Sequence, residues 1–488
     1  MVFNSFHFVL FFPIVALIYY SLPHKLRHIW LLAASYYFYM CWNATYAILI
    51  TITIVVTYFC GILISKAESE KAKKGYVAST FIINLGILVF FKYFNFIGES
   101  INRLLSMGNI AFKIPALDIL LPVGISFYTF QSLGYVVDVY RKDVHPQKNL
   151  LKYALFVSFF PTLLSGPIER SYNLMPQFDE PRNFDYNRAR EGFIMLLWGY
   201  FKKVVIADRL APYVDHIYNN LGDVGTAAII IATIFFTVQI YCDFSGYSDI
   251  AIGTAKIMGF NLIKNFDLPY TSKSIAEFWR RWHISLSTWF RDYLYIPLGG
   301  NRVSRKRWIF NIMLVFIVSG IWHGANWTFL LWGLLHGIYQ VIGKISRKPK
   351  DKLLSKLKIS KNAWYYKVSA RFITFCSVAI AWVFFKANTV QDAFYIFKEV
   401  IKAIPRIAQT NMPRLFLGRS IYFYDFVIGA VLIIILLFGE RRIESFLKKL
   451  PYRILPIRWF AYLFIIFFII LLGIYGSLSP ASFIYLQF

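Results

Sequence analysis

The sequence predicts an all-α integral membrane protein with about 11–13 membrane segments, some of them re-entrant. Hydrophobic residues make up 58% of its 488 residues and charged residues only 16%, and the mean hydropathy is +0.53. Soluble globular domains carry about 25% charged residues. This composition excludes a disordered chain, a disulfide scaffold and a coiled coil.

The chain is strongly basic, with 52 Lys and Arg residues against 25 acidic residues and a formal charge of +27. In a membrane protein such an excess indicates cationic loops on the cytoplasmic side that face anionic lipids, so nucleic acid is not an expected partner. The 4 cysteines are scattered without a CxxC pair, and no HExxH motif is present. The sequence therefore predicts no metal site, and the cysteines are expected to be buried small apolar residues.

Candidate membrane segments follow one another along the whole chain, which we interpret as one polytopic domain over residues 1–488. A helix needs about 20 apolar residues to cross the hydrocarbon layer, and several of the segments are shorter or are interrupted by Gly, Pro or polar residues. They cover residues 6–22, 29–42, 44–64, 77–97, 119–139, 153–168, 227–242, 309–322, 327–342, 372–385, 423–438 and 459–477. The first lacks the basic start and cleavage site of a signal peptide, so we expect it to be retained.

Basic clusters between the segments set the expected orientation in a cytoplasmic (inner) membrane. They lie at residues 24–28, 66–74, 141–152, 280–307, 344–367 and 441–458. Both termini then lie outside, as does the nearly charge-balanced connection 98–118. Residues 386–419 also fall outside, although they carry six basic and two acidic residues, and we expect an amphipathic helix at the interface there. No internal repeat of the kind found in many transporters is present.

His323 lies inside an apolar stretch, residues 311–343, that basic residues flank on both sides. If both flanks are cytoplasmic, the stretch enters the membrane and returns as a hairpin. Sixteen residue steps separate Arg307 from His323, which is about 24 Å of helix, so His323 is expected near the apex. An ionisable residue at that depth is a candidate functional site, and histidine exchanges protons near neutral pH. A neutral, hydrogen-bonded histidine between helices is the alternative.

His336 follows 13 residues later in a second His-Gly pair. On a continuous helix it would point about 220° away from His323, so the two share a face only if the helix breaks. We leave its role open between a structural and an auxiliary catalytic one.

At these residues the sequence resembles the membrane-bound O-acyltransferases, and it is most similar to the bacterial branch that acetylates alginate or peptidoglycan. Two long blocks and the C-terminal tail carry the resemblance. They read EFWRRWHISLSTWFRDYLYIPLGGNR at 277–302, SGIWHGANWTFLLWGLLHG at 319–337 and FIYLQF at 483–488. The resemblance implies that His323 is the family's catalytic histidine, where a donor tunnel meets an acceptor tunnel. It also implies acetyl-CoA as donor substrate, with no tightly bound cofactor.

The block 277–302 interleaves arginines with aromatic residues. Such a surface either anchors at lipid headgroups or binds the phosphates of a pantetheine donor by Arg–phosphate pairs. The candidate donor-binding residues are Arg280, Arg281, Trp282, Arg291 and, beside His323, Asn326. His283 is expected to hydrogen-bond locally.

The extracytoplasmic tail 479–488 contains the pattern F-x-Y-x-x-F at Phe483, Tyr485 and Phe488. It resembles the C-terminus of a small peptide of D-alanylation systems, in which the tyrosine is thought to carry the acyl group. The resemblance implies that Tyr485 relays an acyl group, with His323 assisting its phenol. The alternative is an aromatic belt at the interface.

A further polar motif, YCDFSGYSD at 241–249, holds Asp243 and Asp249. Six residues apart on a helix, the two carboxylates point in opposed directions, which argues against a glycosidase-type pair. We expect each to pair with a basic residue of the core. G-x-S-x-G is absent, so no Ser–His–Asp triad is assigned.

Together the patterns predict an acyltransferase that moves acetyl from cytoplasmic acetyl-CoA across the membrane for O-acetylation of an envelope polysaccharide. The expected partners are an extracytoplasmic O-acetyltransferase, that polysaccharide and membrane lipids. A D-alanyl transferase that uses a carrier-protein thioester, an enzyme that acylates a lipid or a protein, and a transporter or channel remain alternatives.

Overall fold

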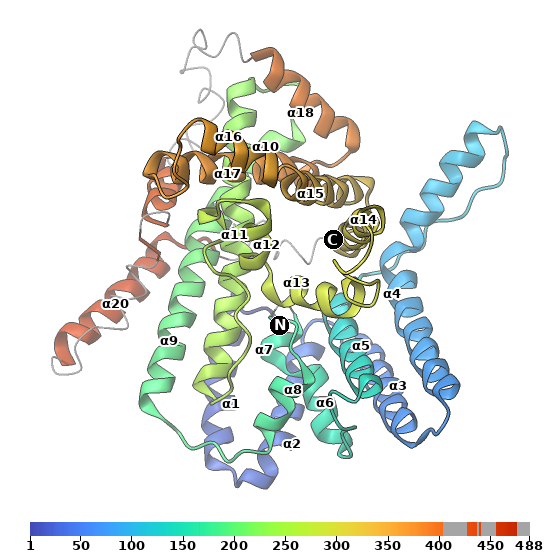
Figure 1. The fold of residues 1–488 in the computed structure, drawn as a ribbon. Helices are drawn as coiled ribbons and strands as arrows, with labels where there is room; N and C mark the ends of the chain where they lie inside the picture. Colours follow the sequence, from blue (N-terminus) through green and yellow to red (C-terminus); the bar gives the residue numbers. More distant parts are fainter. Residues whose placement is uncertain (165, 404–426, 437–438, 441–454, 476–488) are drawn as a thin grey trace. The chain divides into compact units, whose positions relative to one another are not determined.

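The computed structural model describes residues 1–164, 166–403, 427–436, 439–440 and 455–475 (Figure 1). Throughout these residues the regular structure is helical, without a strand, so the all-α prediction is confirmed. Contacts divide the chain into two compact units. Unit 1 comprises Met1–Phe193 and Ala251–Ile263, and unit 2 comprises Ile194–Ile250 and Lys264–Phe488. The expectation of a single membrane domain stays a prediction.

The unit boundary falls within two long helices, α9 (Tyr186–Tyr200) and α11 (Thr226–Ile257). Five helices are long and apolar enough to cross a membrane, counting only the described residues. They span Ala44–Lys66, Glu70–Met107, Thr226–Ile257, Trp364–Lys386 and Leu455–Leu472. The chain is therefore built as a membrane protein.

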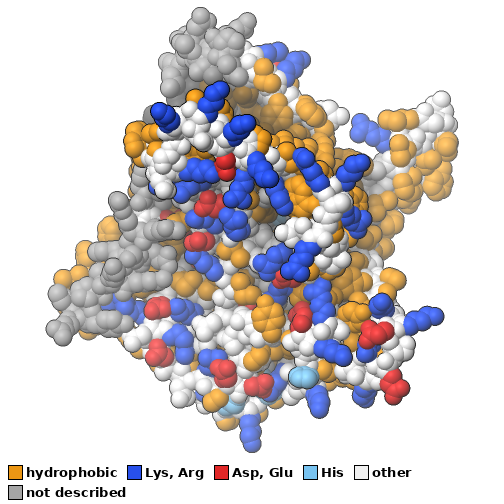
Figure 2. All heavy atoms as spheres, viewed as in Figure 1, with side chains coloured by type: hydrophobic (Ala, Val, Ile, Leu, Met, Phe, Trp, Pro, Cys, Tyr) orange, Lys and Arg blue, Asp and Glu red, His pale blue; other side chains and the backbone are white. Residues whose placement is uncertain are grey.

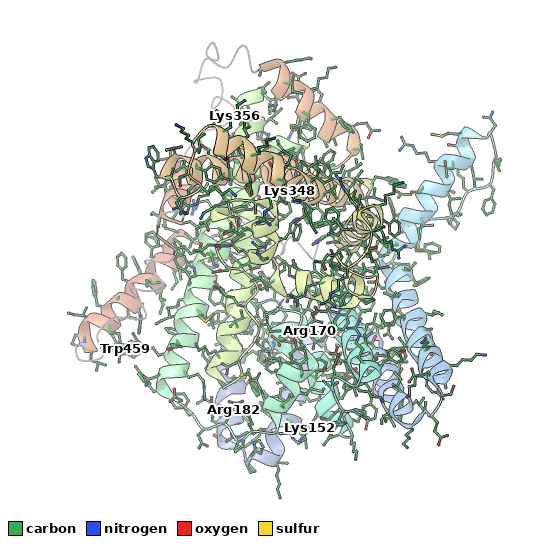
Figure 3. The ribbon with its side chains drawn as sticks, in the orientation of Figure 1. Lys152, Arg170, Arg182, Lys348, Lys356 and Trp459 are labelled. Carbon is green, nitrogen blue, oxygen red and sulfur yellow. The ribbon has the colours of Figure 1, made fainter. Side chains whose placement is uncertain are left out.

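Unit 1 holds the N-terminal helices of the chain. Their bounds are α1 Phe6–Ser21, α2 His24–Met40, η1 Ala44–Tyr46, α3 Ala47–Lys66, α4 Glu70–Met107, α5 Ile125–Arg141, α6 Leu150–Ser158, α7 Phe160–Leu163, α8 Ser171–Leu174 and η2 Met175–Phe178. The predicted segment 153–168 is not one helix, because α6 ends at Ser158 and Pro161 in the next turn lacks the N–H that would continue it. Figure 3 labels Arg170, which follows this break.

The connection after α4 is held by two asparagine side chains of that helix. The Asn95 amide donates to the Leu117 carbonyl at 2.8 Å and accepts from the Leu117 N–H at 2.9 Å. Asn102 does the same with Ile114, at 2.8 Å in both directions. The two amides thus satisfy backbone groups that a segment without secondary structure leaves unpaired.

Unit 2 contains the remaining elements. Their bounds are η3 Phe201–Ala207, a π-helix, α10 Asp208–Asn219, η4 Pro269–Thr271, α12 Ile275–Arg281, α13 Ile284–Phe290, η5 Arg291–Tyr295, a second π-helix, α14 Arg305–His323, α15 Trp327–Ile345, α16 Arg347–Lys356, α17 Trp364–Lys386, α18 Val390–Ala403 and α20 Leu455–Leu472. The helix α18 shows that part of the stretch 386–419 is helical. Its expected place at the interface stays a prediction.

Buried ion pairs fasten η3 to its neighbours. Lys203 Nζ lies 2.8 Å from an Asp208 oxygen and 2.5 Å from an Asp243 oxygen. Lys202 Nζ lies 2.7 Å from an Asp249 oxygen. The expectation that Asp243 and Asp249 pair with basic residues is confirmed. Because an unpaired buried charge is costly, these pairs fix the position of η3 against α11.

The helices α14 and α15 form the hairpin that the flanking basic residues predict, and two glycines let their backbones meet. A Cβ on Gly320 would overlap the Phe329 carbonyl oxygen, and a Cβ on Gly333 would overlap the Phe316 carbonyl oxygen. Only glycine permits this approach, which resembles the small-residue contacts of packed membrane helices.

We therefore expect Gly333→Ala to lower the free energy of unfolding by about 1–3 kcal/mol, because the added methyl forces the two backbones apart. Gly343→Ala on the same helix is the matched control, since nothing lies within 4 Å of its Cβ position. There, alanine should leave stability unchanged or raise it by up to about 1 kcal/mol. Thermal unfolding in detergent measures both variants, and equal unfolding temperatures would contradict the backbone contact.

Candidate active site

His323 is the last residue of α14, at the point where the hairpin turns. Gly324 leaves the helix with an extended backbone, φ −164° and ψ 156°. Asn326 then caps α15, because its side chain accepts a hydrogen bond from the Thr328 N–H at 3.0 Å. The helix thus breaks directly after His323, and the prediction that the residue lies at the apex of a hairpin is confirmed.

Aromatic rings surround the His323 imidazole, which is 3% exposed. Its ring centroid lies 4.8 Å from that of Trp332, 5.0 Å from that of Trp322 and 5.5 Å from that of Phe385, all edge-on. Such contacts hold the imidazole in one orientation and exclude bulk water. A base in these surroundings acts with little competition from water.

His336 is fully buried on α15 and joins the same aromatic cluster. Its Nδ1 accepts a hydrogen bond from Trp279 Nε1 at 3.2 Å. An indole N–H only donates, so a neutral His336 carries its proton on Nε2. The Trp332 ring lies 4.8 Å from the His323 ring and 4.9 Å from the His336 ring, and it therefore contacts both imidazoles. The choice between a structural and an auxiliary role stays open.

His283 precedes α13, and its side chain hydrogen-bonds to Asn265, which lies 18 residues earlier in the chain and outside the block 277–302. Its Nδ1 lies 3.1 Å from Asn265 Oδ1, and Ser285 Oγ donates to the same oxygen at 3.0 Å. Burial lowers the pKa of the His283 imidazole to about 3, so the ring is neutral and its Nδ1 donates. The Trp322 ring lies 6.2 Å from His283 as well as 5.0 Å from His323. One indole therefore links the two histidine neighbourhoods.

A cavity of about 360 Å³ lies between α12, α13, η5 and α14. Its wall is mostly apolar, with two exposed arginines, Arg280 and Arg291. It is lined by Trp279, Arg280, Ile284, Leu286, Ser287, Thr288, Phe290, Arg291, Tyr295, Ile312, Val315, Phe316 and Ser319. His323 is not part of this lining, but Ser319, one helical turn earlier, is.

The other predicted donor-binding residues lie outside this lining. Arg281 pairs with Glu277 at 2.7 Å, and Trp282 is 1% exposed. Asn326 caps α15 and donates to the Asn388 carbonyl at 3.0 Å. Of the predicted set, the structure brings Arg280 and Arg291 together at the cavity. The tail 479–488, and with it Tyr485, lies outside the described residues.

Comparison with known proteins connects this site to a family. Residues 146–385 match the membrane-bound O-acyltransferase family model, a range that includes both histidines of the hairpin and both arginines of the cavity. A probable alginate O-acetylase of Azotobacter vinelandii is 40% identical over 404 residues, which cover 81% of this chain and 77% of the relative. The chain belongs to the membrane-bound O-acyltransferase family.

Two further relatives of this membrane-bound O-acyltransferase are named for polymers other than alginate. A peptidoglycan O-acetyltransferase of Helicobacter pylori is 35% identical over 399 residues, covering 76% of this chain and 73% of the relative. A teichoic acid D-alanyltransferase of Streptococcus thermophilus is 30% identical over 286 residues, which cover 54% of this chain and 68% of the relative. Family membership makes the chain an acyltransferase, and its membrane-capable helices agree with a membrane-bound family.

Proposed function

We propose that this acyltransferase lies in the cytoplasmic membrane and moves acetyl from cytoplasmic acetyl-CoA to an envelope polysaccharide. The names of the alginate and peptidoglycan relatives support the acetyl group and the type of acceptor. The observation that carries the proposal is the helix break at His323, one turn beyond a cavity that presents two arginines. A thioester bound in that cavity lies one turn of α14 away from His323.

In the proposed reaction His323 acts first as base and then as acid. Its imidazole takes the proton of an acceptor hydroxyl while that oxygen attacks the acetyl carbonyl, forming a C–O bond. The C–S bond of the thioester then breaks, and the departing thiolate takes the proton from His323. Such general acid–base assistance contributes about 10²–10⁴-fold to a rate.

Arg280 and Arg291 are proposed to bind the phosphates of the donor. Both arginines are exposed residues at the cavity, where Arg291 Nε also pairs with Asp292 at 2.7 Å. The remaining lining suits the uncharged pantetheine arm. Arginine pairs with phosphate through two parallel hydrogen bonds, which fixes the position of the donor. Acetyl-CoA is then a substrate that binds and leaves, with no cofactor held permanently.

The proposed acceptor at the site is the phenol of Tyr485 in the C-terminal tail, from which an extracytoplasmic partner transferase takes the acetyl group for the polysaccharide. A phenyl ester remains reactive toward sugar hydroxyls, so the relay conserves much of the thioester's free energy. With a pKa near 10 in water, a tyrosine hydroxyl needs a base to react at neutral pH, and the proposal gives that task to His323.

A second candidate function is D-alanyl transfer from a carrier-protein thioester. The similarity to the Streptococcus thermophilus D-alanyltransferase favours it as the alternative. Supplying the purified chain with acetyl-CoA or with D-alanylated carrier separates the two functions. A transporter or channel would move substrate without consuming either thioester.

We expect His323→Gln to lower acetyl transfer by about 10²–10⁴-fold, because glutamine fills similar space but cannot shuttle the proton. Two measurements report the effect: the consumption of acetyl-CoA by membrane preparations and the O-acetyl content of the envelope polysaccharide. His145→Gln is the control, since His145 is exposed in unit 1. Full acetylation by His323→Gln, at normal membrane levels of the protein, would end the catalytic assignment.

We expect the double variant Arg280→Gln/Arg291→Gln to raise the KM for acetyl-CoA by about tenfold or more, because charge-assisted hydrogen bonds to phosphate are lost. The rate with S-acetyl-N-acetylcysteamine, which has no phosphate, should stay unchanged. Arg302→Gln, exposed and outside the lining, is the matched control. An equal loss with both donors would instead indicate a structural role for the two arginines.

Tyr485→Phe should abolish acetylation of the polysaccharide and leave the aromatic ring of the tail in place, because only the attacking oxygen is removed. Mass spectrometry of the C-terminal peptide should find an acetyl adduct on Tyr485 in the wild-type chain when the partner transferase is deleted. Tyr475→Phe, in the described part just before the tail, is the control. Normal acetylation by Tyr485→Phe would leave the tail as an interfacial anchor.

A further inference from the structure

The short helix α16 carries a row of lysines. Lys348, Lys352 and Lys356 follow one another at intervals of four residues and are all exposed. Residues at this spacing lie above one another on a helix, about 5–6 Å apart between Cβ atoms. Figure 3 labels Lys348 and Lys356 on this element. The row therefore presents three ammonium groups on one side of the helix.

Two leucines form a second, apolar row beside the lysines. Leu353 is 56% exposed and Leu357, which directly follows the helix, is 57% exposed. Each leucine follows a lysine of the row by one residue, so the leucine row lies about 100° around the helix axis. A helix with separate cationic and apolar rows is typical of elements that lie in a membrane interface.

The surroundings of α16 add to the positive charge. Residues 344–367 contain nine Lys or Arg residues and one acidic residue, Asp351, which pairs with Lys361 at 2.7 Å. Lys344, at the end of α15, lies 4.3 Å from the Trp308 ring near the start of α14. Figure 2 shows basic side chains gathered over α16, with little acidic surface among them. This surface fits an anionic ligand.

Two contacts fix α16 beside the first turn of the membrane-capable helix α17. Lys350 Nζ lies 5.5 Å from the Tyr366 ring, and the Asp351–Lys361 pair ties α16 to the loop that leads into α17. The first residue of α17, Trp364, is 77% exposed. Tryptophan at the end of an apolar helix is typical of the headgroup level of a bilayer. The lysine row consequently lies near the level at which α17 begins.

We propose that α16 lies in the membrane interface and binds anionic phospholipid headgroups, such as phosphatidylglycerol, through Lys348, Lys352 and Lys356. The lysines contact the phosphates, and Leu353 and Leu357 reach the acyl chains below them. A soluble anionic partner fits the lysines but leaves the leucines and Trp364 without an apolar partner. A lipid satisfies both rows, and this favours it over a carrier protein or a free phosphate ester.

The test uses the purified full-length chain in phosphatidylcholine nanodiscs with increasing phosphatidylglycerol. Native mass spectrometry counts retained phosphatidylglycerol, and thermal unfolding reports stabilisation by it. The triple variant Lys348→Ser/Lys352→Ser/Lys356→Ser should lose this stabilisation, with apparent affinity for phosphatidylglycerol lowered by about tenfold or more. The control Arg103→Ser/Lys113→Ser/Lys273→Ser removes the same charge from exposed residues outside the basic clusters, and it should keep the stabilisation by phosphatidylglycerol.

A second variant, Leu353→Ser/Leu357→Ser, keeps all charges and should also weaken retention, because the helix then no longer inserts its apolar row. Unchanged retention by this variant would overturn the interfacial placement. Equal responses of wild type and the α16 lysine variant would overturn lipid binding by the row. Displacement of phosphatidylglycerol by free glycerol phosphate would also overturn it and assign the row to a soluble phosphate ester.

Discussion

The close backbone contact between α14 and α15 is the constraint on which the candidate site depends. Gly320 and Gly333 allow each helix to meet a carbonyl oxygen of the other, and no larger residue fits there. With the helices held this close, Trp332 of α15 reaches the ring of His323 at the end of α14. The same indole contacts His336 one turn further along α15. The two glycine contacts thus bring Trp332 against both imidazoles.

The cavity and the surroundings of His323 differ in their exposure to water. The two arginines are exposed at the cavity. His323, one turn beyond Ser319, lies among aromatic rings and is 3% exposed. Under the proposed function the phosphates stay at the arginines, and the acyl end advances past Ser319 into the drier surroundings. Excluding water there protects the thioester from hydrolysis.

Much of this arrangement could be predicted from the sequence, because it depends on local patterns. Basic residues on both sides of one apolar stretch predict a hairpin, and the break after His323 falls at a Gly-Ala-Asn sequence, where a capping residue follows a glycine. The contact of Trp279 with His336 joins residues 57 positions apart, and that of Asn265 with His283 joins residues 18 apart. Such pairs depend on how helices pack, which composition and periodicity do not encode. The pairing of Arg281 with Glu277, four residues earlier on the same helix, follows a local pattern, whereas the place of Arg280 at the cavity depends on how α12 packs against α13 and α14.

The most direct measurement asks whether the donor occupies the cavity next to His323. Ser287→Cys places a thiol in the cavity lining at a half-buried position, in a background without the exposed Cys41 and the half-buried Cys376. A maleimide should label this thiol in open membrane vesicles, and acetyl-CoA should protect it at concentrations near its KM. Labelling that acetyl-CoA leaves unchanged, in a variant that still transfers acetyl groups, would contradict the account.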